Sequence, residues 1–547
     1  MKINSLISEE SERKLLLEKS HLISDALKQM KPKKRDALYD TVSDMYLNGP
    51  QELSEHLALL IRSFLRHGQI PEVLISCVLR PLVKNKFDDI TESTNYRAIA
   101  GGCLILKLID QIFLILEGSK LNFDQLQFAY QKNNSTTMCS WMVTSVIEHY
   151  LNDGSRVFGA SMDMSKAFDM VDWNFLFSDL LKRRVDPMFL RLMIYIYEHQ
   201  KCSVKWGESN SSSFGVKNGV RQGGVSSAVL FGVYINDLIV ELRSSKLGCT
   251  IFGEYCGVFV FADDLFLLSA SRNGLQCMVN LCNKFVQRRN LKFWTNRNPL
   301  KSKTKCIVFD KKIRCEPLKI KLNGDLLPWV HEVTHLGCTL ESDNKMKKDM
   351  IIKRCIFNNR VNSLLQEFNT SSPAVLMKCV GSYTTSFVGS QIWDLNSDGC
   401  NKLYRSWNVL IRNVYRLDRR THRCLIEPIS KALHLKTSLC SRFLKFALKI
   451  LDSDKFIVRF LGKLTVEDLR TTFGRNMRNI SNACNVSQDK LSPAIVKTHM
   501  KYFDAQFEDK WKISICDELF GVKNNETVLE GLTSEEIEYM FHYVCIN

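Results

Sequence analysis

Four residues in the middle of the chain, Phe261-Ala262-Asp263-Asp264, place two adjacent carboxylates between two apolar runs. The runs are Val258–Phe261 and Leu265–Leu268, and this pattern predicts a β-hairpin with both acids at its tip. Buried charges need a compensating partner, and a divalent cation held by carboxylates and substrate phosphates is one such partner. For the dipeptide alone, a solvent-exposed hairpin tip is the simpler interpretation, because Asp is common in turns.

A third acid, Asp163, follows directly on an apolar strand that we expect over Arg156–Met164. Asp169, which precedes a helix expected over Trp173–Lys182, is better interpreted as a helix N-cap. If Asp163 meets Asp263 in space, three carboxylates converge. That is the two-metal arrangement for in-line phosphoryl displacement.

A Gly-rich loop, Asn218–Ser227, lies between these acidic motifs. Glycine allows the backbone to approach a ligand closely, and Ser226 and Ser227 are able to cap the helix expected over Ala228–Leu242. A loop of this kind at the start of a helix can cradle a phosphate or a nucleotide, although many loops have the same composition.

The elements that must position these residues alternate between strand and helix, which predicts an α+β fold with antiparallel strands, helices on one face and the acids at strand ends. The other strands and helices that we expect are a β-rich run at Val73–Val83, a helix at Ile99–Leu116, a polar hairpin at Ser203–Val216 that turns near Glu208–Ser212, a helix at Gly274–Gln287, strands at Cys306–Phe309 and Ile320–Leu322, and basic helices after Asp343.

The chain is basic: 75 Lys and Arg residues against 58 Asp and Glu residues give a net charge of +17. Such a surplus suits a polyanionic partner, although a soluble protein can also simply be basic. Within residues 401–479 basic residues outnumber acidic ones about threefold, with aromatic residues interleaved. Helices with a solvated basic face and their aromatic side chains in the core explain the aromatic residues better than base stacking does.

The 19 cysteines follow no disulfide framework, and Met1–Glu9 has no apolar segment of a secretory signal. We therefore expect reduced thiols and a protein of the nucleus or cytoplasm that is not secreted. No apolar run reaches about 18 residues, so no membrane span is expected. A zinc site at His422, Cys424, His434 and Cys440 is disfavoured, because their spacing fits no common finger.

Five motifs, taken in order, resemble the reverse transcriptases of non-LTR (LINE-type, CR1-like) retrotransposons. They are Ser165–Asp169 (SKAFD) after Asp163, Gly219–Gly224 (GVRQGG) leading to Tyr234–Leu238 (YINDL), Phe261–Asp264 (FADD), Lys303–Phe309 (KTKCIVF) and His335–Gly337 (HLG). The resemblance runs from about Gly68 to Leu340 and more loosely to about Asp452.

The resemblance implies a right-hand polymerase with fingers, palm and thumb, an antiparallel palm sheet and a basic helical C-terminal region. The implied divisions are an N-terminal helical extension at 1–66, fingers and palm at 67–342, a thumb-like region at 343–420 and the basic region at 421–547. The implied activity is templated addition of dNTPs to a primer 3′-OH. The implied partners are an RNA template and a DNA or RNA primer, with no membrane involved.

The resemblance also implies roles for individual residues. Asp163, the backbone carbonyl of Met164, and Asp263 would hold two Mg²⁺ ions, for which Mn²⁺ is a usual substitute, and Asp264 would be the third acid. Nucleotide-binding roles are implied for a steric gate at Phe168, the loop residues Gln222 and Gly223, the fingers residue Arg97 with Lys84 as a weaker candidate, and Lys303 near the leaving group with Lys301 as an alternative. The turn at His335–Gly337 matches the primer grip.

Simpler interpretations stay open: Phe168 as a core residue, Arg97 as an ordinary ion-pair partner and Lys303 as a solvated side chain. Ala98 and Ala228 stand where the family usually has Pro, and Ala129 stands where it has Gly. Ala98 and Ala228 lose the φ restriction that Pro supplies, and Ala129 could not hold a positive φ without strain.

Two alternative functions remain: a metal-dependent nuclease, which needs neither a sugar gate nor a nucleotide loop, and a catalytically silent nucleic-acid-binding remnant. About 65 residues precede the first polymerase motif, too few for the endonuclease that this family usually carries. We therefore expect target-DNA nicking to lie outside this chain, which would then be a fragment or a decayed copy.

Overall fold

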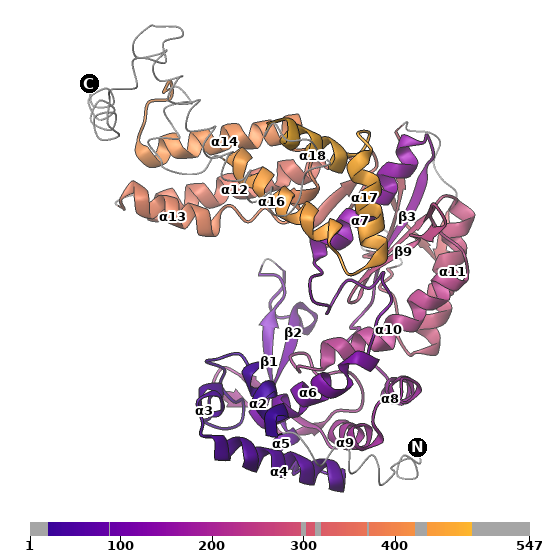
Figure 1. The fold of residues 1–547 in the computed structure, drawn as a ribbon, viewed down its shortest axis with the longest axis vertical. Helices are drawn as coiled ribbons and strands as arrows, with labels where there is room; N and C mark the ends of the chain where they lie inside the picture. Colours follow the sequence, from indigo (N-terminus) through magenta and orange to yellow (C-terminus); the bar gives the residue numbers. More distant parts are fainter. Residues whose placement is uncertain are drawn as a thin grey trace. The chain divides into compact units, whose positions relative to one another are not determined.

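The computed structural model describes residues 20–86, 88–296, 302–311, 319–368, 371–421 and 435–483, which form two compact units that divide between Val333 and Thr334 (Figure 1). The first unit mixes helices and sheets, and the second is mainly helical. The mixed content of the first unit confirms the expected α+β fold class.

The first unit alternates between helices and strands along the chain. The helices are α2 (Ser20–Lys28), α3 (Ser43–Leu47), α4 (Gln51–His67), α5 (Glu72–Ile75), α6 (Leu104–Glu117), α7 (Thr136–Asn152), α8 (Trp173–Lys182), α9 (Pro187–Glu198), α10 (Ser227–Ser244) and α11 (Arg272–Arg288). The strands are β1 (Cys77–Val83), β2 (Tyr96–Gly102), β3 (Val157–Asp163), β4 (Lys201–Trp206), β5 (Ser209–Asn210), β6 (Phe214–Gly215), β7 (Thr250–Ile251), β8 (Glu254–Tyr255), β9 (Val258–Phe261), β10 (Asp264–Ser269), β11 (Lys305–Phe309), β12 (Ile320–Leu322), β13 (Asp325–Leu327) and β14 (Trp329–Val330).

The sheet that carries the acids has the order β14-β11-β3-β10-β9. Strand β3 is paired antiparallel with both β10 and β11, and β9 is paired antiparallel with β10. Strand β14 adds to β11 in parallel, which is a departure from the expected all-antiparallel sheet. In β10, Leu265–Ser269 are all buried, so side chains on both faces of the sheet are covered around this strand.

A second sheet, β2-β1-β4-β5, lies earlier in the chain, with β6 also paired to β4. It corrects one expectation: the run Ile99–Leu116 is not one helix. The chain first completes β2, which pairs residue by residue with β1 as far as Gly102 opposite Cys77, and then begins α6. Hydrogen bonds to β1 outweigh the local apolar pattern here, and the Gly101–Gly102 pair, poor in helix propensity, separates the two elements.

Another expectation was partly wrong, because the run Val73–Val83 begins as the short helix α5 before it becomes β1. The hairpin expected over Ser203–Val216 is present as β4–β5, and its two-residue turn lies between Trp206 and Ser209, at the start of the predicted turn.

The second unit contains β16 (Cys338–Glu341) and helices α12 (Lys347–Glu367), α13 (Pro373–Tyr383), α14 (Asp398–Tyr415), α16 (Leu435–Leu451), α17 (Phe456–Glu467) and α18 (Thr472–Ala483). Strand β15 (Glu332–His335) pairs with β16 across the division of the units. The aromatic side chains interleaved with the basic residues are mostly in the core: Tyr404, Trp407, Phe443 and Phe446 are all buried. This confirms the interpretation as amphipathic helices with a solvated basic face.

No helix of the described ranges is both long and apolar enough to cross a membrane. Three of the four disfavoured zinc candidates, His422, Cys424 and His434, lie outside the described residues, and Cys440 is buried. The thumb-like and C-terminal divisions expected at 343–420 and 421–547 stay predictions.

Candidate active site

The two acidic motifs meet across the central strand pair of the sheet. Strand β10 pairs antiparallel with β3 in the register that places Asp264 opposite Asp163. Asp263 lies between β9 and β10, in a tight turn in which Ala262 has a φ of 59°. Asp163 ends β3, Asp264 begins β10, and Asp263 lies in the turn beside them. The structure therefore brings the three predicted acids together at one end of strands β3 and β10.

Asp163 is held from two sides by backbone hydrogen bonds. Its carbonyl oxygen accepts the N–H of Trp294 at 2.8 Å, and the N–H of Ser165 donates to the carbonyl of Lys292 at 2.9 Å. Met164 forms a β-bridge with Phe293 between these two bonds. The segment after α11 thus fixes the backbone from which the Asp163 carboxylate and the Met164 carbonyl would act.

The acids carry more negative charge than their surroundings compensate. Although Asp264 is partly open to solvent, packing around its carboxyl, followed by the charges of Asp263 and Asp163, raises its pKa to about 6. Burial also raises the pKa of Asp263, and Asp163 adds to that rise. Lys303 lies beside them, with its Nζ 3.6 Å from the Oδ2 of Asp163.

This donor set fits a divalent cation. Within the described part of the chain no group of three or more His, Cys, Asp or Glu side chains is arranged to hold a metal ion by itself. Mg²⁺, however, is usually bound by one or two carboxylates together with substrate phosphates and waters, so a closed protein cage is not required. Burial and the mutual repulsion of the acids both disfavour their ionised forms, and such a cation would offset both.

Phe168 stands five residues after Asp163, on a turn closed by hydrogen bonds from the N–H groups of Asp169 and Met170 to the carbonyl of Lys166. Its ring stacks on Phe231 of α10, with centroids 4.6 Å apart and an interplanar angle of 18°. The Phe168 side chain is half-buried, so it is neither a core residue nor a free surface residue. The role of Phe168 as a steric gate stays a prediction.

The Gly-rich loop packs against this turn. Gln222 donates from Nε2 to Oδ1 of Asp169 at 2.8 Å, and its carbonyl accepts the N–H of Ala100 at 2.7 Å. Asp169 is therefore not a helix N-cap as expected. The N-cap of α8 is Asp172, because three residues of turn separate Asp169 from the helix.

Gly223 is required at its position. It has a φ of 116°, and a Cβ there would lie 2.8 Å from the carbonyl oxygen of Ala100. Gly219 has a φ of 90°, and a Cβ there would lie 2.8 Å from the carbonyl of Asp169. Both glycines let the loop approach neighbouring backbone, as the sequence predicted for this kind of loop.

The expected caps of α10 are absent, because Ser226, the N-cap residue, makes no side-chain cap bond. Asp110 of α6 takes that role: its Oδ2 accepts the N–H groups of Val225 and Ser226 at 3.2 and 3.5 Å. Its carboxylate also pairs with Arg221, with the Nη2 atom 3.0 and 3.3 Å from the two oxygens. Asp110 was not predicted as a functional residue, and its signal in the sequence is an acid in the middle of a mainly apolar helix.

The expected cations gather near the acids. Burial, followed by Lys303 and Arg97, lowers the pKa of Lys84, and Arg97 and Lys303 counter the rise of the Asp263 pKa. Arg97 and Lys84 come from β2 and the end of β1, which are hydrogen-bonded neighbours. Lys166 also lowers the pKa of Lys84, so it belongs to the same cluster, although the sequence motifs did not single it out. Lys301 lies outside the described residues.

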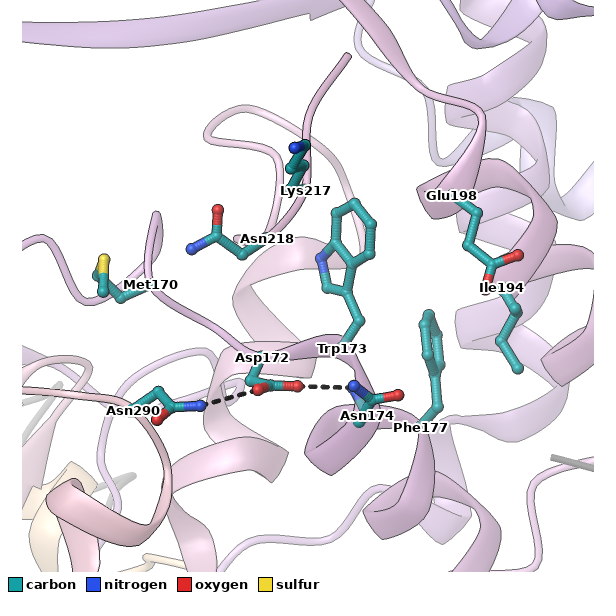
Figure 2. Close-up of a pocket in the computed structure, with 10 residues that line it drawn as sticks. All are labelled: Met170, Asp172, Trp173, Asn174, Phe177, Ile194, Glu198, Lys217, Asn218 and Asn290. Atoms are coloured by element: carbon teal, nitrogen blue, oxygen red, sulfur yellow. Dashed lines mark hydrogen bonds between the residues drawn. The ribbon is translucent and has the colours of Figure 1, made fainter.

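Behind the Phe168 turn lies a cavity of about 350 Å³, lined by residues from Met170 to Phe177, from α9 and from the start of the Gly-rich loop (Figure 2). Trp173 donates from Nε1 to the carbonyl of Gly219 at 2.8 Å, which ties α8 to the loop. The Asp172 carboxylate accepts the Asn174 N–H and the Asn290 amide, both at 2.9 Å (Figure 2).

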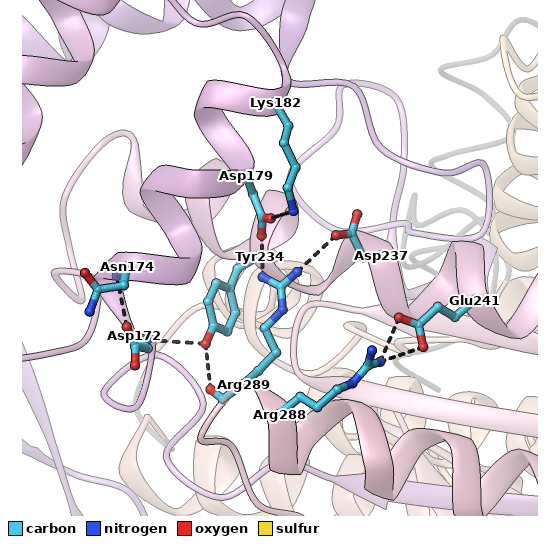
Figure 3. A network of polar contacts seen from close by, with 9 residues as sticks. All are labelled: Asp172, Asn174, Asp179, Lys182, Tyr234, Asp237, Glu241, Arg288 and Arg289. Carbon is cyan, nitrogen blue, oxygen red and sulfur yellow. Dashed lines mark hydrogen bonds and ion pairs between the residues drawn. The ribbon is translucent and has the colours of Figure 1, made fainter. Parts of the chain in front are cut away.

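A buried arginine at the end of α11 joins that helix to α8 and α10. Arg289 pairs with Asp179 of α8 and with Asp237 of α10, in the latter case at 3.0 Å (Figure 3). Its own carbonyl accepts the Tyr234 hydroxyl at 2.6 Å, and the same hydroxyl accepts the N–H of Asp172 (Figure 3). Arg289 stands three residues before Lys292, so this network anchors the segment that holds Asp163.

Two further expectations concern turns. Ala129 is not among the residues with positive φ. The neighbouring Tyr130 has a φ of 61°, so the strain expected at Ala129 does not arise there.

The His335–Gly337 motif forms the β15–β16 turn with Leu336 and Gly337 at positive φ, and burial lowers the pKa of His335 to about 3. Its role as a primer grip stays a prediction.

Comparison with known proteins agrees with this geometry. Residues 84–340 match the family described as reverse transcriptase (RNA-dependent DNA polymerase). The chain is 24% identical over 318 residues to the Pol polyprotein of the type-1 retrotransposable element R2 of Nasonia vitripennis, covering 57% of this chain and 30% of that protein. It is 25% identical over 342 residues to the probable RNA-directed DNA polymerase from transposon BS of Drosophila melanogaster, covering 58% of this chain and 35% of that protein.

The chain thus spans about a third of the length of these curated relatives. Among solved structures, telomerase from Candida albicans aligns with 78% of this chain and 71% of its own, at 11% identity and a TM-score of 0.35. The family match covers the sheet edge with the three acids, the Phe168 turn and the Gly-rich loop. Residues 84–340 therefore form a domain of the reverse transcriptase (RNA-dependent DNA polymerase) family, and the curated relatives are proteins of the retrotransposable element R2 and of transposon BS.

Proposed function

We propose that this chain is an RNA-directed DNA polymerase that adds dNTPs to a primer 3′-OH on an RNA template. The observation that carries the proposal is the register that sets Asp264 opposite Asp163, with Asp263 in the adjoining turn. Acids whose pKa values are raised by burial and by each other need a compensating cation, and a reverse transcriptase supplies that cation with its nucleotide substrate.

Asp163, the Met164 carbonyl and Asp263 would hold two Mg²⁺ ions, or Mn²⁺ in their place, and Asp264 would be the third acid. When bound, two such ions lower the pKa of the primer 3′-OH and hold the triphosphate. Arg97, Lys84 and Lys303 would meet the triphosphate, because they bring positive charge to the same edge of the site.

Phe168 would exclude a ribose 2′-OH, since its ring is held by Phe231 and cannot retreat toward α10. Gln222 and Gly223 would contact the incoming nucleotide and the templating base. Gln222 donates to Asp169, and nucleotide binding would exchange that hydrogen bond for one to the substrate. The partners would be an RNA template, a DNA or RNA primer and dNTPs, and we propose a nuclear or cytoplasmic location.

Primer extension on an RNA template with dNTPs and Mg²⁺ tests the proposal, beside an Asp263→Asn, Asp264→Asn variant and a reaction with EDTA. We expect extension by the wild-type chain and none in either control. Well-folded wild-type protein that binds a primer–template duplex but extends nothing would leave the silent nucleic-acid-binding remnant. Mg²⁺-dependent cleavage without extension would instead favour a nuclease, for which the supported ring of Phe168 has no use.

A further inference from the structure

Tyr130 lies close to the acids although it is remote from them in sequence. The segment before it pairs with β9: the N–H of Phe128 donates to the carbonyl of Val260 at 2.8 Å, and the N–H of Val260 donates to the carbonyl of Leu126 at 2.9 Å. The Oε1 of buried Gln127 accepts the N–H of Ala129 at 3.0 Å and that of Ala262 at 3.4 Å. These bonds fix the chain at Tyr130 against the turn that carries Asp263.

The Tyr130 ring meets the gate. It stands edge-on to Phe168, with centroids 6.5 Å apart and an interplanar angle of 85°. Phe231 covers a face of the same Phe168 ring. Burial raises the pKa of the Tyr130 hydroxyl, and the charges of Asp263 and Asp264 add to that rise.

Two features separate Tyr130 from an ordinary core aromatic. Tyr130 is 37% exposed, so it is not a core residue. Its φ of 61° is unfavourable for a bulky residue, and such strain persists where the surrounding structure holds the residue in place. The hydrogen bonds through Gln127 provide that hold.

We propose that Tyr130 is a second specificity-determining residue for the nucleotide sugar, acting by holding the Phe168 ring in its gating position. The inference rests on the proposed function. Phe231 stacks on a face of the Phe168 ring, and Tyr130 makes an edge contact with it. Without Tyr130, the Phe168 side chain would be free to rotate toward the space that Tyr130 occupies. A Phe168 ring that can rotate away would leave room for the 2′-OH of a ribonucleotide, whereas a 2′-deoxy sugar fits with the ring in either position.

The test is single-nucleotide insertion with a dNTP and with the matching rNTP, comparing the two kcat/KM values for each variant. Tyr130→Ala should lower the dNTP preference about tenfold, since steric discrimination in a pocket of this kind is worth roughly 10- to 200-fold. Tyr130→Phe keeps the ring and should keep the wild-type preference, and Tyr130→Leu should lie between. Tyr383→Ala, which removes an exposed tyrosine from the end of α13, is the matched control and should change nothing.

An unchanged preference in Tyr130→Ala, in protein that still extends with dNTPs, would overturn the inference and leave the proposed function standing. A loss in Tyr130→Phe as large as that in Tyr130→Ala would also overturn it, because the hydroxyl and not the ring would then be responsible. If Tyr130→Ala does not fold, the Leu variant decides between the same two results. A wild-type chain that extends nothing would refute the proposed function and this inference together.

Discussion

The buried ion pair beneath the Gly-rich loop gives the sharpest test of how the site is built. The side chains of Asp110 and Arg221 are only 8% and 6% exposed. Desolvation alone would lower the pKa of Arg221, but the Asp110 carboxylate, together with Tyr197 and Cys77, more than offsets it, so the pKa is raised. The pair therefore keeps a charged guanidinium where an isolated one would be strongly disfavoured.

Asp110→Asn keeps the shape of the side chain and removes its charge. Breaking a buried pair from one side costs roughly 3–5 kcal/mol, because the remaining charge has no compensation. It also weakens the acceptor for the Val225 and Ser226 N–H groups at the start of α10. At about 2 °C per kcal/mol for a large domain, the melting temperature of the first unit should fall by roughly 6–10 °C.

The measurement is thermal unfolding followed by circular dichroism, with the midpoint compared among variants. Glu72→Gln is the control: it breaks the Lys201–Glu72 pair, whose side chains are both 52% exposed, and should leave the midpoint nearly unchanged. The double variant Asp110→Leu, Arg221→Met should recover much of the loss, because it removes both buried charges. An Asp110→Asn midpoint within about 2 °C of wild type would refute the reasoning.

Three further predictions concern the acids and the residues around them. Asp264→Asn should stabilise the metal-free protein by about 1 kcal/mol at pH 7.5 in EDTA. A rise of the Asp264 pKa from 3.8 to about 6 corresponds to about 3 kcal/mol, and solvent screening reduces this figure because the residue is partly exposed. Only the ionised form of Asp264 destabilises the protein, so the stabilisation by Asp264→Asn should vanish as the pH falls from about 6 toward 4. A stabilisation that persists in unfolding curves at pH 4 would contradict the attribution to the Asp264 charge. Phe168→Ala should raise rNTP use about tenfold or more in single-nucleotide insertion, and an unchanged sugar preference would make Phe168 a packing residue only. Lys303→Ala should raise the KM for dNTPs several-fold, whereas a fall in kcat alone would place Lys303 in the chemical step and not in binding.

The local pattern of the sequence determined the elements that carry the acids. The apolar runs on either side of Asp263-Asp264 predicted the hairpin, the strand before Asp163 was correct to within a residue or two at each end, and α8 begins and ends at the predicted residues. These features depend on a period of two or of 3.6 within a few residues, so they can be read without knowing the fold.

Other features depended on partners far away in the chain. The backbone of Tyr96–Gly102 became a strand because β1 offered hydrogen bonds, not because of its own propensity. Asp169 was assigned to a helix cap, and it instead bonds Gln222, 53 residues later. Ser226 was expected to cap α10, and Asp110, 116 residues earlier, accepts its N–H instead. Which side chain accepts a given backbone N–H depends on the tertiary positions of the competing groups, and the local spacing of residues in the sequence does not reveal those positions.

The sequence by itself thus determined which acids this protein has, the order of its motifs, and that each acid stands at the end of a strand or in a turn. Only the tertiary structure decided that Asp264 lies opposite Asp163, that Tyr130 stands beside the Phe168 ring, and that a buried Asp110–Arg221 pair supports the loop between them. The physical reason is that strand register and burial are set by the packing of segments about a hundred residues apart, where a shift of one residue would turn every side chain to the opposite face.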